Sequence, residues 1–261
     1  MNWPLVAALA VAGLVIGWFL RAVIFRHSVP AGAPPARACP QCEEQILVDG
    51  RAPRPAVSRP GRLPRPAMSA SGRCSACRAR IGPPPLAVEV VTAVLFGALA
   101  ARVHPALVLA AACWLAGCAV ALAWIDAAVQ RLPDALTAPA YAGTVLLLLL
   151  AAATTGHWRD LLRAVAGGLA LAVAYLALAV ISRSAVGLGD AKLAASLGTL
   201  TAWPGWTTLI AGVFAGFLLG AVYGVGLLVA RRARRGQHIP FGPFMIAGAF
   251  LALLASSAAG S

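Results

Sequence analysis

The stretch Ala106–Asp126 reads ALVLAAACWLAGCAVALAWID, a run of uncharged and mostly apolar residues that ends in a single acid. A helix rises 1.5 Å per residue, so about 20 such residues cross the ~30 Å hydrocarbon core of a bilayer. The stretch therefore predicts a transmembrane helix with a carboxyl group at one end.

Comparable apolar runs recur along the whole chain. Of the residues, 61% are hydrophobic and 11% are charged, which excludes an ordinary soluble domain and a disordered chain. A shorter run between Asp190 and Trp203 spans only about 21 Å. We predict an all-α, polytopic integral membrane protein with about eight transmembrane helices, the other six being Trp3–Leu20, Leu86–Ala101, Leu136–Ala153, Leu161–Ile181, Thr207–Ala230 and Phe244–Ala259.

The net charge of +13 is interpreted as membrane topology and not as nucleic-acid binding. If the N-terminus is outside, the inner loops hold 18 of the 21 basic residues, and only Arg102, Arg159 and Arg163 lie outside. Because Lys and Arg accumulate in cytoplasmic loops, this orientation is the expected one.

One sizeable polar segment, residues 26–85, separates the first transmembrane helix (residues 1–25) from a seven-helix membrane domain (residues 86–261). Its portion 51–66 is dominated by Arg and Pro, which is typical of an extended linker. Contact of these arginines with anionic lipid headgroups is the alternative interpretation.

The polar segment also carries two Cys-x-x-Cys pairs, Cys39–Cys42 and Cys74–Cys77. Disulfides are rare in the reducing cytoplasm, whereas four thiolates at this spacing suit a tetrahedral zinc ion. Such a closed site has no open coordination position, so it is expected to stabilise a small domain. Reduced thiols without a metal are the alternative.

Acidic residues are rare, and four of the eight lie at membrane depth: Glu89, Asp126, Asp134 and Asp190. An intramembrane carboxyl group is costly and therefore a functional candidate. Asp134 follows a proline and is expected to cap the next helix. Asp126 stands at a helix C-terminus, where the dipole disfavours an anion, and a pairing with Arg131 is its structural alternative.

Asp190 ends the sequence Gly187-Leu188-Gly189-Asp190, whose glycines permit a close backbone approach and unusual dihedral angles. A helix-capping role is also open to Asp190. Asp126 and Asp190 are both expected at the cytoplasmic ends of their helices. Two such carboxyl groups across a cavity share one proton, so one activates water while the other polarises a carbonyl. This chemistry hydrolyses a peptide bond without a covalent intermediate.

Three segments together resemble the type IV prepilin leader peptidases, aspartic proteases of the bacterial inner membrane. They are Asp126 with Pro133-Asp134 and Thr137, then Gly187–Leu193, then Ile239–Phe244 before the last helix. The two cysteine pairs, with Gly72-Arg73 before the second, and Val88-Glu89 fit the cytosolic domain and the second helix of that family.

The resemblance implies that Asp126 and Asp190 are the catalytic pair. The supporting residues that it implies are Gly187, Gly189, Asp134, Lys192, Gly242 and Pro243. The implied substrates are prepilins or pseudopilins, cleaved at the cytoplasmic face after a glycine and just ahead of an apolar helical segment. Many members also methylate the new N-terminus with S-adenosylmethionine.

Two departures from the family pattern bear on methyl transfer, which is left open. Arg21 stands where the family usually has Asn, and an Arg/Pro-rich stretch replaces the expected residues between the cysteine pairs. A proton-coupled transporter and a zinc-bearing scaffold for pilus assembly are the alternative functions. The sequence does not determine the oligomeric state or the residues that would bind S-adenosylmethionine.

Overall fold

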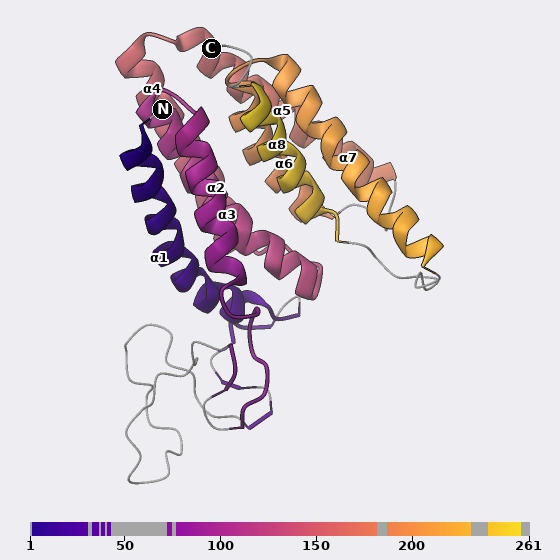
Figure 1. The fold of residues 1–261 in the computed structure, drawn as a ribbon. Coiled ribbons are helices and arrows are strands. Elements are labelled where there is room, and N and C mark those ends of the chain that lie inside the picture. Colours follow the sequence, from indigo (N-terminus) through magenta and orange to yellow (C-terminus); the bar gives the residue numbers. More distant parts are fainter. Residues whose placement is uncertain are drawn as a thin grey trace.

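A computed structural model describes residues 2–30, 33–36, 38–39, 41–42, 72–74, 77–181, 187–230 and 240–256. Within these residues the chain forms eight helices and no strand (Figure 1). Their bounds are α1 Trp3–His27, α2 Ala87–Arg102, α3 Ala106–Val129, α4 Asp134–Thr155, α5 Trp158–Ile181, α6 Leu188–Ala202, α7 Trp206–Val229 and α8 Gly242–Ser256. The all-α prediction is confirmed, and each expected run falls on one helix, although the ends of runs and helices differ. Residues 257–259 of the last run lie outside the described residues. The Arg/Pro-rich stretch 51–66 lies outside the described residues.

Five of these helices, α1, α3, α4, α5 and α7, are long and apolar enough to cross a membrane. The other three are shorter, with 16 residues in α2 and 15 each in α6 and α8. The short run from Asp190 to Trp203 forms most of α6, and nearly all of its residues from Ala191 to Ala202 are buried among the neighbouring helices.

The helices alternate in direction, and α3 lies at the centre of the bundle (Figure 1). It contacts α1, α2, α4, α6 and α8. The end of α3 and the beginnings of α6 and α8 consequently lie at the same end of the molecule, toward the described cysteine-bearing segments.

Close glycine contacts join the helix pairs. An added Cβ on Gly17 of α1 would lie 2.5 Å from the Cα of Glu89 in α2, and one on Gly13 would lie 2.7 Å from the Cα of Ala93. The backbones of α7 and α8 approach similarly at Gly216 and Gly248. Small residues spaced four apart allow this approach in lipid, where helix association depends on close packing.

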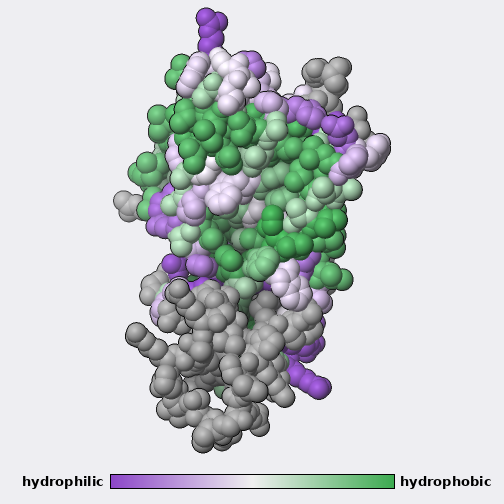
Figure 2. Space-filling view, turned by 90° about the vertical axis from the view of Figure 1, so that its left-hand side faces the viewer, coloured by the Kyte–Doolittle hydropathy of each residue, from purple (hydrophilic) through white to green (hydrophobic). Residues whose placement is uncertain are grey.

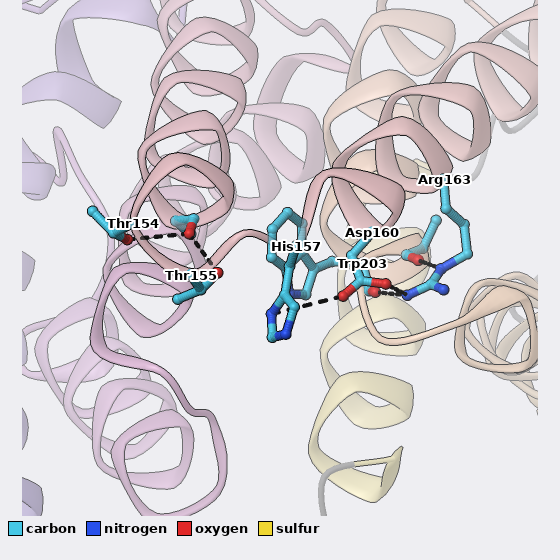
Figure 3. Close-up of polar contacts among 8 residues, drawn as sticks. Thr154, Thr155, His157, Asp160, Arg163 and Trp203 are labelled. Atoms are coloured by element: carbon cyan, nitrogen blue, oxygen red, sulfur yellow. Dashed lines mark hydrogen bonds and ion pairs between the residues drawn. The ribbon is translucent and has the colours of Figure 1, made fainter.

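At the opposite end of the bundle, Arg163 of α5 caps the C-terminus of α6 (Figure 3). Its guanidinium donates hydrogen bonds to the carbonyl oxygens of Ala202, at 2.9 Å, and Trp203. It also pairs with Asp160 at 2.9 Å. A cation suits a helix C-terminus, so this contact fixes α6 against α5.

The outer surface is apolar over much of the bundle (Figure 2). Large exposed residues on α1 include Trp3, Val11, Val15, Trp18 and Phe19. So many exposed large apolar side chains are rare on soluble monomers and fit contact with lipid acyl chains.

Candidate active site

Asp126 lies in the last turn of α3 and is only 5% exposed. The backbone N–H of Gly242, the first residue of α8, donates a 3.1 Å hydrogen bond to its Oδ2. Arg131 donates to the carbonyl oxygen of Pro30 at 2.9 Å. The alternative pairing of Asp126 with Arg131 is therefore not observed, and a backbone N–H from another helix holds this carboxylate.

Asp190 occupies the first turn of α6 and is half-buried. Its Oδ2 accepts a 3.0 Å hydrogen bond from the backbone N–H of Gly187, which precedes the helix. Gly187 has an ordinary extended backbone (φ −88°, ψ 157°), so the unusual dihedral angles that were expected are not observed at this residue. Gly189 does permit a close approach, because an added Cβ would lie 2.9 Å from the Cβ of Leu132.

The two aspartates come from the last turn of α3 and the first turn of α6. They are separated by more than sixty residues in sequence, and the fold brings them to one end of the bundle (Figure 1). Two carboxyl groups that meet at such a place can share one proton, which is what general acid–base catalysis by an aspartate pair requires.

Asp134 does not cap a helix as predicted. Pro133 occupies the cap position of α4, and Asp134 is the first helical residue. Its Oδ1 instead accepts a 2.5 Å hydrogen bond from Nζ of Lys192 in α6. This contact links the beginning of α4 to α6.

The loop between Asp126 and Asp134 also borders a cavity of about 300 Å³. Its wall includes His27 from the end of α1, Arg131 and Leu132. Leu132 also packs against Gly189, so one side chain separates this cavity from the backbone beside Asp190.

Tyr175 is a buried residue that the sequence analysis did not identify. It lies on α5, is 3% exposed, and its ring centroid is 6.3 Å from that of Phe241, the residue before Gly242. The one available signal is that it is one of only three tyrosines and lies inside an apolar span.

The four cysteines of the two pairs come together, with their Sγ atoms all within 4.8 Å of one another. The Sγ atoms of Cys39 and Cys77 are 3.7 Å apart, and those of Cys42 and Cys74 are 3.6 Å apart. Sulfur atoms bound at about 2.3 Å to one tetrahedral ion are separated by about 3.8 Å. The described residues can therefore hold a metal ion.

The pKa of the Cys39 thiol lies below the ordinary value for cysteine. Burial raises its pKa, but hydrogen bonds from the backbone of Gln41 and Cys42 and contacts with neighbouring thiols outweigh this and lower the pKa to about 7. The thiolate is the form of cysteine that binds a metal.

A buried ion pair lies at the junction of the cysteine cluster and the helices. Nη1 of Arg21 in α1 donates to Oε1 of Glu89 in α2 at 3.1 Å, and both residues are at most 4% exposed. Nη2 of Arg21 lies against Gly72, two residues before Cys74.

Comparisons with known proteins identify the family of the chain. The Type IV leader peptidase family model matches residues 113–225, which include both aspartates. A prepilin leader peptidase/N-methyltransferase of Aeromonas salmonicida is 33% identical over 225 residues, covering 84% of this chain and 71% of the relative. The Stutzerimonas stutzeri protein of the same name is 31% identical, covering 94% of this chain and 88% of the relative. A Pseudomonas aeruginosa protein of that name is 34% identical over 84% of this chain and 71% of its own length.

No solved structure matches the chain. The extent of these matches, spanning both aspartate segments, establishes that the chain belongs to the type IV leader peptidase family.

Proposed function

We propose that the protein is an aspartic endopeptidase that cleaves the leader peptides of type IV prepilins or pseudopilins. The observation that carries the proposal is that the last turn of α3, with Asp126, and the first turn of α6, with Asp190, lie at the same end of the bundle. Family membership and the names of the relatives support the prepilin class of substrate.

In the proposed mechanism, the ionised member of the pair takes a proton from a water molecule. The water oxygen forms a bond to the scissile carbonyl carbon, while the protonated aspartate polarises the carbonyl oxygen. Collapse of the tetrahedral intermediate breaks the C–N bond, and the leaving amine receives a proton from the pair. The Gly242 N–H holds Oδ2 of Asp126 throughout, which orients its other oxygen toward the water.

The basic-residue distribution supports an N-terminus outside and both aspartates at the cytoplasmic face of the inner membrane. In this orientation Arg102, Arg159 and Arg163 lie at the outer end. The segment that carries the cysteines then lies in the cytoplasm, beside the proposed active site.

We propose zinc as the ion of the four-cysteine cluster. The ligand set is all thiolate and the sulfur separations suit tetrahedral coordination, which is typical of structural zinc. Its role is to hold residues 26–85 together as a small domain against α1 and α2.

The proposal is tested by incubating purified protein in detergent with a prepilin-type substrate, with and without S-adenosylmethionine, and weighing the products. Cleavage after the leader glycine is expected, and a further methyl group would reveal methyl transfer, which the relatives' names include.

Asp126→Asn and Asp190→Asn should each abolish cleavage without loss of the fold, because neither amide can act as the base or acid. Asp160→Asn is the matched control, since Asp160 lies at the opposite end of the bundle beside Arg163 (Figure 3). Wild-type cleavage by either active-site variant would refute the assignment.

A further inference from the structure

The short connection between α3 and α4 begins four residues after Asp126 and contacts the first turn of α6. Its side chain Leu132 lies against Gly189, because a Cβ added to that glycine would be 2.9 Å from the Cβ of Leu132. Leu132 is 8% exposed and belongs to the main hydrophobic core. Since Gly189 directly precedes Asp190, this side chain limits how closely the first turn of α6 can approach the end of α3.

A second contact from the same stretch lies on the other side of Asp190. Nζ of Lys192 donates a 2.5 Å hydrogen bond to Oδ1 of Asp134, the first residue of α4. Leu132 and Asp134 therefore hold the first turn of α6 on both sides of Asp190. We refer to residues 131–134 as the α3–α4 clamp. The position of Asp190 depends on where this clamp lies.

Arg131 ties the clamp to the chain that follows α1. Its Nη1 donates a 2.9 Å hydrogen bond to the carbonyl oxygen of Pro30 and a longer one, of 3.5 Å, to that of Val29. A guanidinium presents its N–H groups in a fixed planar arrangement, so it holds the segments it joins in a defined relation. The chain that it grips leads to Cys39, so the clamp is connected to the cysteine-bearing segment.

Open space lies beside this connection. The cavity of about 300 Å³ is lined by two stretches of chain, residues 131–135 and the residues His27, Val29, Ala33 and Pro35. The hydrogen bonds of Arg131 join these two stretches next to a space that no described side chain fills. Without these bonds the clamp can shift toward the cavity, and Leu132 moves with it because it is the next residue in the chain.

We propose that Arg131 is a positioning residue for the aspartate pair, an inference that rests on the proposed peptidase function. It holds the α3–α4 clamp, and through Leu132 the first turn of α6, in the place that the proposed reaction requires. It acts through the clamp and not by contact with the reacting atoms. A displacement of about 1 Å at a reacting group can reduce a rate about 100-fold, so a small shift of the clamp is enough.

Arg131→Met removes the hydrogen bonds and keeps much of the side-chain length. We expect kcat for the prepilin-type substrate to fall about 10-fold, with KM close to the wild-type value. The thermal unfolding midpoint should change little, because Pro30 is exposed and its carbonyl oxygen can bind water instead. Arg131→Lys keeps a donor and should recover part of the lost kcat.

Arg159→Met is the matched control. It removes the same charge from an exposed position in the first turn of α5, at the opposite end of the bundle (Figure 1). It should keep wild-type kcat, because Arg159 is remote from the clamp.

A double-mutant cycle on kcat distinguishes positioning from direct contact with the substrate. If Arg131 acts through Leu132, Arg131→Met should lower kcat less than about 2-fold in a Leu132→Ala background. An arginine that bound the substrate directly would cause the same loss in both backgrounds, mainly through KM. Activities are expressed per folded protein, because Leu132→Ala also removes buried packing. Leu132→Val repeats the cycle with a smaller loss of buried volume.

The inference is overturned if Arg131→Met keeps wild-type kcat, if only its KM changes, or if the two substitutions are additive in the cycle. A loss of kcat that merely matches a loss of folded protein also overturns it. The Asp126→Asn and Asp190→Asn variants are assayed in parallel. Their inactivity beside a fully active Arg131→Met would reject the role of Arg131 alone, whereas their activity would reject the peptidase assignment itself.

Discussion

Gly242 leaves no room for a side chain beside Asp126. A Cβ added to Gly242 would lie 2.7 Å from Oδ2 of Asp126, an atom at the mobile end of a side chain. The carboxyl group can rotate away at little cost to stability. It then loses the hydrogen bond from the Gly242 N–H and the orientation that the proposed catalytic pair needs.

Gly242→Ala should therefore lower kcat strongly, by about 100-fold, while the thermal unfolding midpoint changes little. The measurement is cleavage rate alongside thermal unfolding in detergent. Gly226→Ala is the control, because no atom of the described part of the chain lies within 4 Å of the Cβ it would add. Full activity of Gly242→Ala would show that the Asp126–Gly242 contact is not needed for catalysis.

The buried pair of Arg21 and Glu89 is a second residue-scale case. Removing Arg21 leaves the Glu89 carboxylate charged and buried without its ion-pair partner, which costs about 3–5 kcal/mol of unfolding free energy. Arg21→Met and Glu89→Leu should each destabilise the protein, whereas the double variant should recover much of the loss. A double-mutant cycle measured by unfolding in detergent tests this. Additive single and double effects would contradict a direct coupling between the two residues.

At the residue scale, the sequence identified the acids but not their partners. Scarcity of charge in an apolar chain was enough to single out Asp126 and Asp190. The partner of Asp126 is a backbone N–H 116 residues away, which carries no side-chain signal. Asp134 was predicted as a cap because it follows proline, yet the proline itself takes the cap position and the acid pairs with Lys192.

At the scale of elements, apolar run length predicted all eight described helices. Hydrophobicity is a local property, so each span can be predicted from its own stretch of sequence. The same stretch does not show which other helices it contacts. The glycines that decide it, such as Gly17 against Glu89, are recognised only once the two backbones are seen in contact.

The α1–α2 contact yields a prediction that belongs to this scale. Gly17→Ala places a Cβ 2.5 Å from the Cα of Glu89, and a backbone atom cannot move aside cheaply. Overpacking of this kind costs about 1–3 kcal/mol, so the unfolding midpoint should fall. Gly97→Ala in the same helix pair is the control, because its nearest neighbour would be Ala10 Cβ at 3.6 Å, an ordinary contact. Equal midpoints for the two variants would contradict tight packing at Gly17.

For the whole molecule, the arrangement places three chemically distinct features at one end of the bundle. The aspartate pair, the Arg21–Glu89 pair and the described cysteines are all there, while Arg163 and Asp160 lie at the other end. The charge asymmetry of the sequence predicts which end is cytoplasmic, since loops rich in Arg and Lys stay inside. The sequence predicts which end of the bundle faces the cytoplasm. That the three features lie at the same end depends on how the helices pack, which the sequence does not show.

Sidedness can be tested directly by labelling engineered cysteines with a membrane-impermeant maleimide. Ala128→Cys lies in the exposed last turn of α3, two residues after Asp126, and His157→Cys lies in the exposed α4–α5 connection (Figure 3). In intact cells stripped of the outer membrane, label should enter at position 157 and not at 128, and inside-out vesicles should give the reverse. The unsubstituted chain corrects for its own six cysteines. If position 128 is labelled from outside, the aspartates face away from the cytoplasm. The enzyme would then meet prepilins only after their leaders had crossed the membrane, and the proposed orientation would be wrong.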